Sequence, residues 1–393
     1  MSSKSKKAAI LILTVILLFG NLCPRTVSAE EKKLHAKAAL LLDADNNRVL
    51  YEKNGYEVMA MASTTKIMTC ILALEYGDMD AVTEVSSYAA SMPKVRLGIR
   101  KGEKYRLEDL LYSLMLESHN DSAVAIAEKI GGSVEGFAEK MNQKAMELGC
   151  NDTFFITPNG LDAVKDGKTH STTARDLAVI TAYAIRNEDF LKIVGTKNYS
   201  FSDIDKKRAF QIANKDLFLE MMDGAVGVKT GFTAQAGYCF VGALKKGDKT
   251  FVSVVLGCGW PPNKSWKWSD TKTLMKYGLE HYEKKDIYQN TQNIKIPVEN
   301  GVTDAVNMIK ETKKIELLLS DEDKVECRYK LPCRIEAPVK TGQLIGYEEY
   351  YVNGRLYDRA AYYAKNNVKK WDLHYCTNEI TKRFLLDLPK PNR

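Results

Sequence analysis

Apolar residues form several strand-like stretches in the first two thirds of the chain. The pattern of apolar positions over 34–51, interrupted by an Asp-Asn-Asn turn at 45–47, predicts an early β-hairpin, with strands at 38–42 and 49–51, that begins a sheet. Two later runs, 237–243 and 250–256, are rich in β-branched and aromatic residues, which favour strands. The segment 224–233 leads into the first of these runs, so we expect it to be a strand as well.

Other stretches show helical spacing instead. One face of a predicted helix, with the i, i+3, i+4, i+7 pattern, consists of Ile67, Cys70, Ile71 and Leu74. Similar apolar runs cover 107–115 and 123–130, and the polar segment 117–121 separates them. A polar segment between two apolar helices is where a loop can hold side chains toward a cleft. A further helix is expected at 270–282, after a loop that contains Trp260, Trp266 and Trp268.

The last third of the chain reads as short strands. They are predicted at 294–298, 305–309, 315–319, 325–330 and 334–339. The Val-Asn-Gly-Arg sequence at 352–355 is typical of a tight hairpin turn, here between strands 347–351 and 356–362. The pattern predicts a small all-β domain.

The amino terminus looks like a targeting segment. Lysines precede the apolar run 8–19, and Val-Ser-Ala at 27–29 has the small residues of a signal-peptidase site. An uncleaved membrane anchor is the alternative, but the run is short for a bilayer span. With 393 residues, 45% of them hydrophobic, the chain has material for two domains. We expect a signal peptide at 1–29, a main domain at 30–283, a β-rich domain at 284–372 and a tail at 373–393.

Charge and cysteine content exclude some functions. Cleavage of the signal peptide would remove four basic residues and no acidic one, which lowers the formal charge from +7 to +3. A modest charge on an exported chain argues against a nucleic-acid partner. Seven of the eight cysteines would remain, with no CxxC pair, so no metal site and no cofactor are indicated. Cys327 and Cys333 are candidates for a bridge, and Cys70 is expected to be buried.

The most informative motif is Ser63-Thr64-Thr65-Lys66. Ser63 would open the helix as its N-cap, and Lys66, three residues on, would stand on the same face within reach of the serine oxygen. A hydroxyl becomes a nucleophile when a neighbouring base takes its proton, and an amine does this if burial or another cation lowers its pKa. A capping serine followed by a surface lysine is the alternative interpretation.

Two further motifs follow in order. Ser118 and Asn120 lie two residues apart in the polar segment, where a hydroxyl can relay a proton and an amide can hold a peptide group. Lys229-Thr230-Gly231 lies on the expected strand before a hairpin. A lysine there offers a fixed cation to an anionic ligand, and the glycine lets a ligand backbone approach the strand edge. A helix cap and a turn lysine are the respective alternatives.

Together the three motifs match in order and spacing those of penicillin-interacting serine enzymes. The flanking sequence resembles the D-alanyl-D-alanine carboxypeptidase family of low-molecular-mass penicillin-binding proteins, from about residue 37 to 282. The resemblance implies an α/β fold: an antiparallel sheet flanked by helices with an all-helical subdomain (β-lactamase/transpeptidase-like), plus a small all-β C-terminal domain. It also implies an exported enzyme at the extracellular face of the membrane or in the cell wall.

The same resemblance implies the chemistry. Catalytic roles would fall to Ser63 as nucleophile, Lys66 as its proton acceptor and Ser118 as the donor to the leaving amine. Asn120, Lys229 and Thr230 would bind the substrate, a peptidoglycan stem peptide ending in D-Ala-D-Ala. The enzyme would remove the terminal D-alanine through an acyl-enzyme, and penicillins and other β-lactams would inhibit it.

Some positions depart from the family or compete with its motifs. The family commonly has glycine where this chain has His119, whose side chain is expected to narrow the cleft or reach the substrate. A second Lys-Thr-Gly, at 340–342, is assigned to a turn. His170 is interpreted as structural. In the tail, only a short apolar face is expected, from Ile380, Phe384, Leu385 and Leu388, so membrane-surface contact would be weak at most.

Two rival functions are open at this point. A serine β-lactamase shares the first and third motifs, but class A enzymes commonly carry a Glu-x-x-Leu-Asn run for deacylation, and the sequence has none. A catalytically silent wall-binding protein could keep the fold without turnover. The sequence does not separate vegetative from sporulation roles, or carboxypeptidase from endopeptidase activity.

Overall fold

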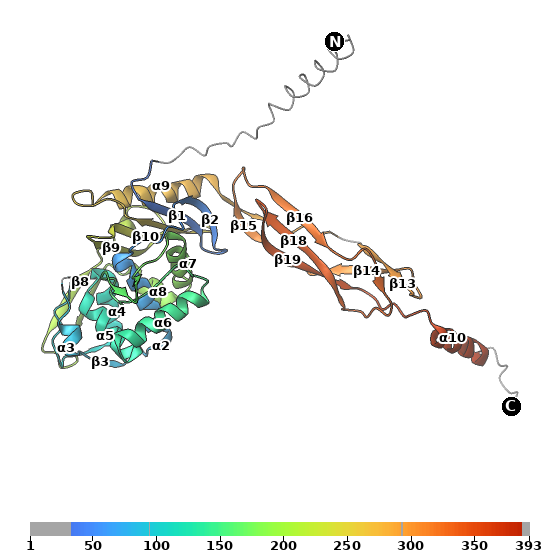
Figure 1. The fold of residues 1–393 in the computed structure, drawn as a ribbon, viewed down its shortest axis with the longest axis horizontal. Coiled ribbons are helices and arrows are strands. Elements are labelled where there is room, and N and C mark those ends of the chain that lie inside the picture. The colour runs from blue at the N-terminus through green and yellow to red at the C-terminus, as the bar shows by residue number, and fades with distance from the viewer. Residues whose placement is uncertain (1–32, 94, 292–293, 387–393) are drawn as a thin grey trace, which may run out of the picture. The chain divides into compact units, whose positions relative to one another are not determined.

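The computed structural model describes residues 33–93, 95–291 and 294–386 (Figure 1). The predicted signal peptide at 1–29 lies outside these ranges. A five-stranded antiparallel sheet forms the centre of the larger part of the chain, in the order β2-β1-β11-β10-β9. Its strands are β1 (Ala38–Asp43), β2 (Arg48–Lys53), β9 (Ala225–Thr233), β10 (Gly237–Lys246) and β11 (Lys249–Leu256). The early hairpin and the three later strands are confirmed, and β9 is an edge strand.

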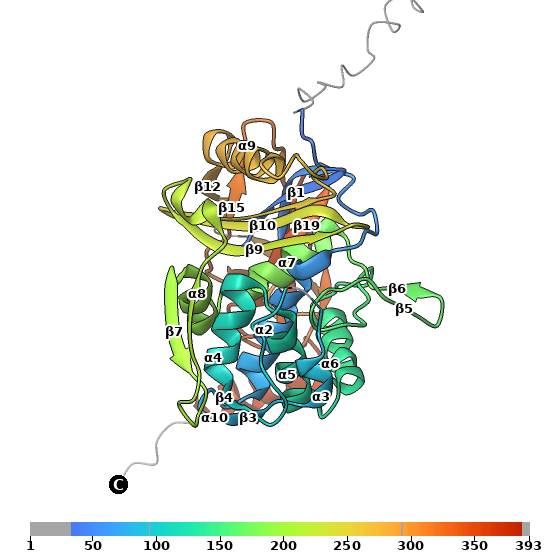
Figure 2. The ribbon, with the colours of Figure 1, turned by 90° about the vertical axis from the view of Figure 1, so that its left-hand side faces the viewer.

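Helices cover both faces of this sheet (Figure 2). One face packs against α9 (Trp266–His281), and the other packs against α2 (Lys66–Tyr76), α7 (Ala174–Ala184) and α8 (Glu188–Gly195). Because both faces are covered, every residue of β1 is buried. The remaining helices of this part are α3 (Ser87–Ala90), α4 (Leu107–Tyr112), α5 (Asn120–Gly131) and α6 (Val134–Glu147). The predicted sheet with flanking helices and a helical subdomain is therefore confirmed.

Short hairpins connect these helices. They consist of β3 (Val82–Glu84) with β4 (Lys104–Arg106), β5 (Val164–Lys165) with β6 (Lys168–Thr169), and β7 (Asn198–Ser202) with β8 (Ala209–Ala213). A 3₁₀ turn, η3 (Leu217–Glu220), leads toward β9. Thr173 caps α7, because its side-chain oxygen accepts from the Asp176 amide at 3.0 Å.

Two sequence expectations about helix starts are wrong. Ser63 is not an N-cap: it lies inside a 3₁₀ turn, η1 (Ala62–Thr65), and α2 begins only at Lys66. The backbone cause is Ala62, whose φ of 49° breaks the helical path just before the serine. Similarly, Trp266 and Trp268 do not form a loop, because α9 begins at the first of them.

The helix predicted over 107–115 changes its winding. Residues of α4 continue directly into a π-helical turn, η2 (Ser113–Glu117), which ends at Ser118 in the left-handed region. A π turn has one residue more than an α turn, and such turns occur frequently at functional sites. Here it delivers the second motif to the start of α5.

The β-rich part has a six-stranded sheet in the order β16-β18-β19-β14-β13-β17. Its strands are β13 (Lys295–Glu299), β14 (Ala305–Lys310), β16 (Val325–Lys330), β17 (Ile335–Glu336), β18 (Leu344–Val352) and β19 (Arg355–Ala364), and a separate pair joins β12 (Glu283–Asp286) to β15 (Glu316–Leu319). The predicted hairpin turn is confirmed, with positive φ at Asn353 and Gly354. The second Lys-Thr-Gly lies in a turn closed by the Gln343 amide donating to the Lys340 carbonyl at 3.0 Å.

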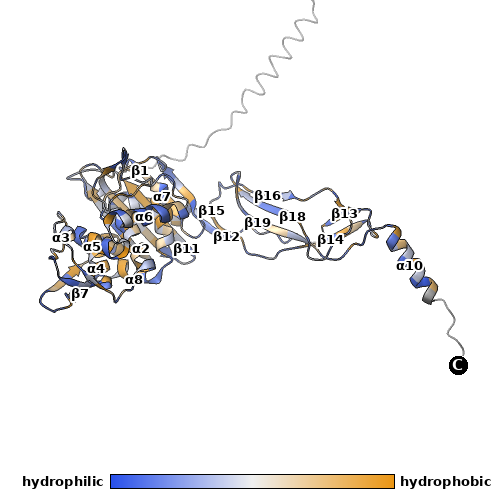
Figure 3. Ribbon diagram, turned by 60° about the horizontal axis from the view of Figure 1, so that its bottom comes forward, coloured by the Kyte–Doolittle hydropathy of each residue, from blue (hydrophilic) through white to orange (hydrophobic). Residues whose placement is uncertain are grey.

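The tail forms α10 (Leu373–Leu386), which carries both polar and apolar residues (Figure 3). Ile380 and Phe384 are exposed, as the short apolar face predicts. Within the described ranges, no helix combines the length and apolar character that crossing a bilayer requires. The candidate bridge between Cys327 and Cys333 is not formed: the first lies within β16, the second is exposed in the loop after it, and both thiols are free.

Candidate active site

The Ser63 hydroxyl sits on a turn that two glycines approach closely. A methyl group on Gly160, which has a φ of +80°, would lie 2.0 Å from the Ala62 carbonyl oxygen. A methyl group on Gly231 of β9 would lie 3.1 Å from the Ser63 amide nitrogen. The turn therefore lies between a loop and the sheet edge, with no room for a side chain at Gly160 and little room for one at Gly231.

The Lys66 amine lies beside that hydroxyl. Its Nζ is 3.0 Å from Ser63 Oγ and 2.9 Å from Asn120 Oδ1, and it also donates to the Asn159 carbonyl. The side chain is fully buried. The spacing of three residues therefore does bring the two groups of the first motif together, and the alternative of a surface lysine is wrong.

Burial changes the protonation of this amine. It lowers the pKa of Lys66 well below its ordinary value, and the nearby charge of Lys229 lowers that pKa further, against the opposing effect of Asp121. The amine donates to the Asn120 side-chain oxygen and to the Asn159 carbonyl, and no carboxylate of the described residues is hydrogen-bonded to it. A buried lysine of this kind can exist as the neutral amine and accept a proton.

The second motif meets the first through Asn120. Asn120 begins α5, and its side-chain oxygen accepts from Lys66. Ser118, two residues earlier, has a φ of 69°, and within the described residues its buried hydroxyl has no hydrogen-bond partner. Buried polar groups without partners are uncommon in folded proteins and cluster at functional sites.

The third motif lies on β9, as predicted. Lys229 is buried, its Nζ donates to the Thr230 carbonyl at 3.2 Å, and Gly231 packs against the Ser63 turn. Burial lowers the pKa of Lys229 to about 7, a carboxylate at Asp216 opposes this, and the charge of Lys267 adds to it. The strand thus holds a buried lysine whose charged form an arriving anion would stabilise.

Two residues of the site, Asn159 and Asp216, escaped the sequence reasoning. Asn159 supplies the carbonyl that accepts from Lys66, and Asp216, whose pKa burial raises to about 7, faces the charge of Lys229. His170 accepts from the Ile156 amide at Nδ1 (2.9 Å), and its Nε2 lies 2.8 Å from Thr65 Oγ1. Thr65 in turn donates to the Ala62 carbonyl at 2.8 Å. The structural interpretation of His170 therefore stands, but its contacts lead to the Ser63 turn.

The expectation for His119 is wrong. Its side chain is 5% exposed and lies 2.8 Å from Ser113 Oγ, inside the fold. It neither narrows the cleft nor lies free to reach a substrate. The cause is the π turn, which places Ser113 beside the ring.

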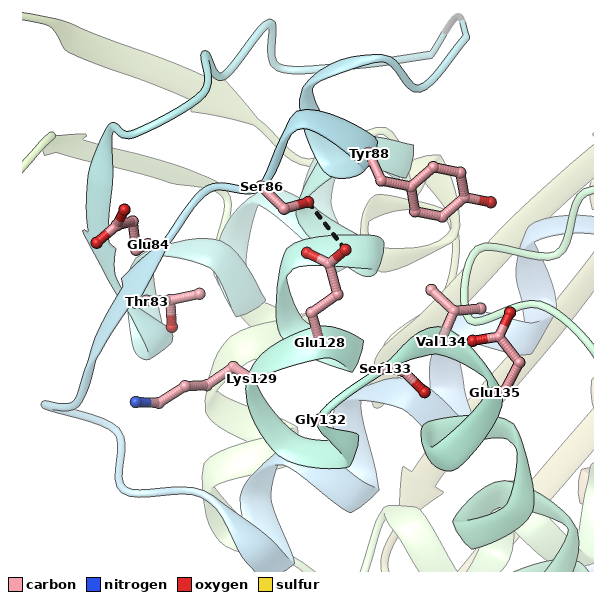
Figure 4. Close-up of a pocket in the computed structure, with 10 residues that line it drawn as sticks. All are labelled: Thr83, Glu84, Ser86, Tyr88, Glu128, Lys129, Gly132, Ser133, Val134 and Glu135. Atoms are coloured by element: carbon pink, nitrogen blue, oxygen red, sulfur yellow. Dashed lines mark hydrogen bonds between the residues drawn. The ribbon is translucent and has the colours of Figure 1, made fainter.

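A cavity of about 580 Å³ lies elsewhere, at the other end of α5 (Figure 4). Its walls come from β3, α3 and the α5–α6 junction, with Tyr88, Glu128 and Lys129 among the lining residues. No residue of the three motifs lines it, so it is not the site described above.

The fold and the paired hydroxyl and amine define a serine hydrolase of the β-lactamase/transpeptidase-like class. Comparison of the sequence with known families narrows this class. A profile described as D-alanyl-D-alanine carboxypeptidase (peptidase S11) matches residues 25–259, and one for the C-terminal domain of penicillin-binding protein 5 matches residues 282–370. The chain belongs to the D-alanyl-D-alanine carboxypeptidase family, and it is a serine peptidase of that family.

Curated relatives cover most of the chain. It is 32% identical over 345 residues to the D-alanyl-D-alanine carboxypeptidase DacF of Bacillus subtilis (strain 168). The aligned region covers 85% of this chain and 86% of the relative. It is 31% identical over 293 residues to a D-alanyl-D-alanine carboxypeptidase of Streptomyces sp. (strain K15). This alignment covers 70% of this chain and 98% of the relative.

Solved structures of penicillin-binding proteins have folds similar to that of this chain. Penicillin-binding protein 5 of Haemophilus influenzae matches with a TM-score of 0.69 and 26% identity, over 86% of this chain and 98% of that one. Penicillin-binding protein D2 of Listeria monocytogenes in its cefotaxime-bound form matches with a TM-score of 0.56 and 29% identity, over 63% and 98% of the two chains.

Proposed function

We propose that this chain removes the terminal D-alanine from peptidoglycan stem peptides through an ester on Ser63. The observation that carries the proposal is the buried Lys66 amine at 3.0 Å from the Ser63 oxygen. A hydroxyl and an amine of lowered pKa at hydrogen-bond distance form an activated nucleophile. The family membership narrows the chemistry to D-alanyl-D-alanine peptides.

In the first step the Ser63 oxygen attacks the carbonyl carbon between the two D-alanines, and the Lys66 amine takes the hydroxyl proton. Negative charge then develops on the carbonyl oxygen. The Ser63 amide, beside Gly231, and the Phe232 amide on β9 are the proposed donors to that oxygen. Donors fixed in advance stabilise such charge more than water does.

In the second step the C–N bond breaks and the departing D-alanine needs a proton. Lys66 holds the proton taken from the serine, and we assign Ser118 to pass it to the amine nitrogen. Its hydroxyl is buried and unpartnered among the described residues, so it is available for this hydrogen bond. Asn120, fixed by Lys66, would hold the substrate amide. Water then hydrolyses the ester and frees the enzyme.

Substrate selection would rest on β9. Lys229 and Thr230 would bind the terminal carboxylate, and the lowered pKa of the lysine would rise again when that anion arrives. The binding of β-lactams follows from the same argument, since they present a carboxylate and a strained amide. We further propose export by a signal peptide at 1–29, followed by domains at 30–283 and 284–372, with the tail making at most weak membrane-surface contact.

The test uses the chain without residues 1–29. Incubation with a pentapeptide ending in D-Ala-D-Ala should release D-alanine, and intact-mass spectrometry after penicillin should show one adduct that maps to the peptide containing Ser63. Ser63→Ala should abolish both, whereas Ser87→Ala, at an exposed serine, should change neither. Persistence of either signal in Ser63→Ala would show another nucleophile.

The carboxylate site has a matched control within the sequence. Lys229→Ala should lower kcat/KM for the pentapeptide by about tenfold or more, because one charge-assisted contact to a buried anion contributes at least this much. Lys340→Ala changes the lysine of the second Lys-Thr-Gly, in a turn of the β-rich part, and should leave kcat/KM unchanged. Rapid catalytic release of penicilloate would favour the β-lactamase reading, and binding without turnover would favour the silent wall-binding protein.

A further inference from the structure

The loop that carries Ser118 is held in an uncommon backbone conformation. Ser118 lies in the left-handed region, which residues other than glycine, asparagine and aspartate seldom adopt unless their surroundings fix them. The amide of Ser118 donates to the Ser113 carbonyl, and the His119 amide approaches the same carbonyl at 3.4 Å. The backbone of Ser113 thus anchors the loop from one side.

The His119 side chain anchors it from the other side. Its Nδ1 lies 2.8 Å from Ser113 Oγ, and that oxygen lies 2.7 Å from Ser122 Oγ on α5. Its Nε2 lies 3.4 Å from a carboxylate oxygen of Glu117. The ring therefore links the π turn before Ser118 to the helix after it.

Glu117 extends this network to the strand side of the site. Its Oε1 accepts from the Ala213 amide at 3.0 Å and from the Lys215 amine at 3.2 Å, immediately before the segment that leads to β9. With Glu117 as acceptor at Nε2, the neutral ring accepts the Ser113 hydroxyl proton at Nδ1. Burial lowers the pKa of His119, and the charges of Lys66 and Lys229 act in the same direction against Asp121 and Glu117, which favours this neutral ring.

His119 itself is under no backbone strain. Its φ is −66°, a value that any residue adopts, so a glycine at this position is not required by the turn. Its polar atoms are directed to Ser113 and Glu117, and it is 5% exposed. The side chain acts on the loop and not on a bound substrate.

We infer that His119 is a positioning residue that holds the Ser118 hydroxyl where it delivers a proton to the leaving amine. This inference rests on the proposed function. In the step concerned, the Ser63 oxygen has bonded to the carbonyl carbon, the C–N bond breaks, and the proton passes from the Lys66 ammonium through Ser118 to nitrogen. A thioester analogue of the same peptide, with sulfur in place of that nitrogen, releases a thiolate and needs no such proton.

The two substrates separate positioning from general damage. His119→Gly should lower kcat for the peptide by about tenfold or more, and kcat for the thioester by less than about threefold, with KM for both unchanged. His119→Asn should restore peptide turnover to within about threefold of wild type, because its amide oxygen can accept the Ser113 proton in place of Nδ1. His281→Asn, at an exposed histidine, is the matched control and should change neither rate.

Ser113→Ala is the second variant, since it removes the anchor and leaves the ring. Like His119→Gly, it should lower kcat for the peptide much more than kcat for the thioester. If His119→Gly does not fold, this variant alone tests the inference. Equal losses on peptide and thioester, or no loss on either, would overturn the inference. Absence of turnover and of penicillin labelling in the wild-type chain would instead overturn the proposed function, which keeps the two failures distinct.

Discussion

The stability of the main domain should depend on pH through His170. Burial, together with the charge of Lys66, lowers the pKa of this imidazole from 6.5 to about 4. Its Nδ1 accepts from the Ile156 and Thr157 amides, so protonation there would direct an N–H at two other N–H groups. The folded chain therefore resists a proton that the unfolded chain accepts.

The magnitude follows from the two pKa values. The difference between 6.5 and about 4 corresponds to about 3 kcal/mol. Between these pH values the unfolded chain binds more protons than the folded chain, so the free energy of unfolding falls as the pH falls. The full contribution is present above pH 6.5, is lost progressively below it, and is gone near pH 4.

The assay compares wild type with His170→Asn in chemical denaturation, followed by tryptophan fluorescence, since three of the four tryptophans lie within 260–268. At pH 7 the variant should be less stable, because it loses the bond to Thr65. The difference in free energy of unfolding between wild type and variant should shrink by about 3 kcal/mol as the pH falls from 6.5 to 4. His374→Asn, at an exposed histidine, is the control. A gap that stays constant to within about 0.5 kcal/mol would refute the reasoning.

Two more predictions follow from packing and buried charge. Gly231→Ala should slow penicillin acylation by about ten- to hundredfold, because its methyl group would meet the nucleophile's amide at 3.1 Å; an unchanged rate constant in a stopped-flow trace would contradict this. Glu348→Ala should destabilise the β-rich part by about 3–5 kcal/mol, because it leaves the buried Lys310 ammonium, 2.7 Å away, without its carboxylate. Hydrogen exchange of β18 and β19 amides measures this loss, which Glu326→Ala, in an exposed pair, should not reproduce.

The local pattern of apolar residues was sufficient to predict the helices and strands that bury one or two faces. The strands β1, β10 and β11 and the helix after Ser63 follow from apolar spacing alone, and the Asn353-Gly354 turn follows from its need for positive φ. The start of α2 was missed because the deciding contact is distant. Gly160, 97 residues after Ser63, lies close to the Ala62 carbonyl, and the sequence around Ser63 does not predict this approach.

The three motifs of the site could be predicted from the sequence, but the residues that hold them in place could not. Ser63 and Lys66 lie three residues apart, so helical geometry brings them together without further information. Asn159 joins them through a backbone carbonyl, which carries no side-chain signature, and it escaped notice for that reason. His119 was misread because a polar residue beside two site residues suggests a cleft, whereas the π turn directs its side chain inward.

The two glycines around the Ser63 turn also limit how this enzyme can change under selection. If penicillins acylate Ser63, a mutation that excludes the drug by adding bulk at Gly160 or Gly231 would push on the same turn that presents the serine. Such a mutant would lose peptidase activity together with drug sensitivity. Tolerance should therefore arise at the rim, at positions such as the exposed Phe232, where a larger or smaller side chain leaves the turn undisturbed.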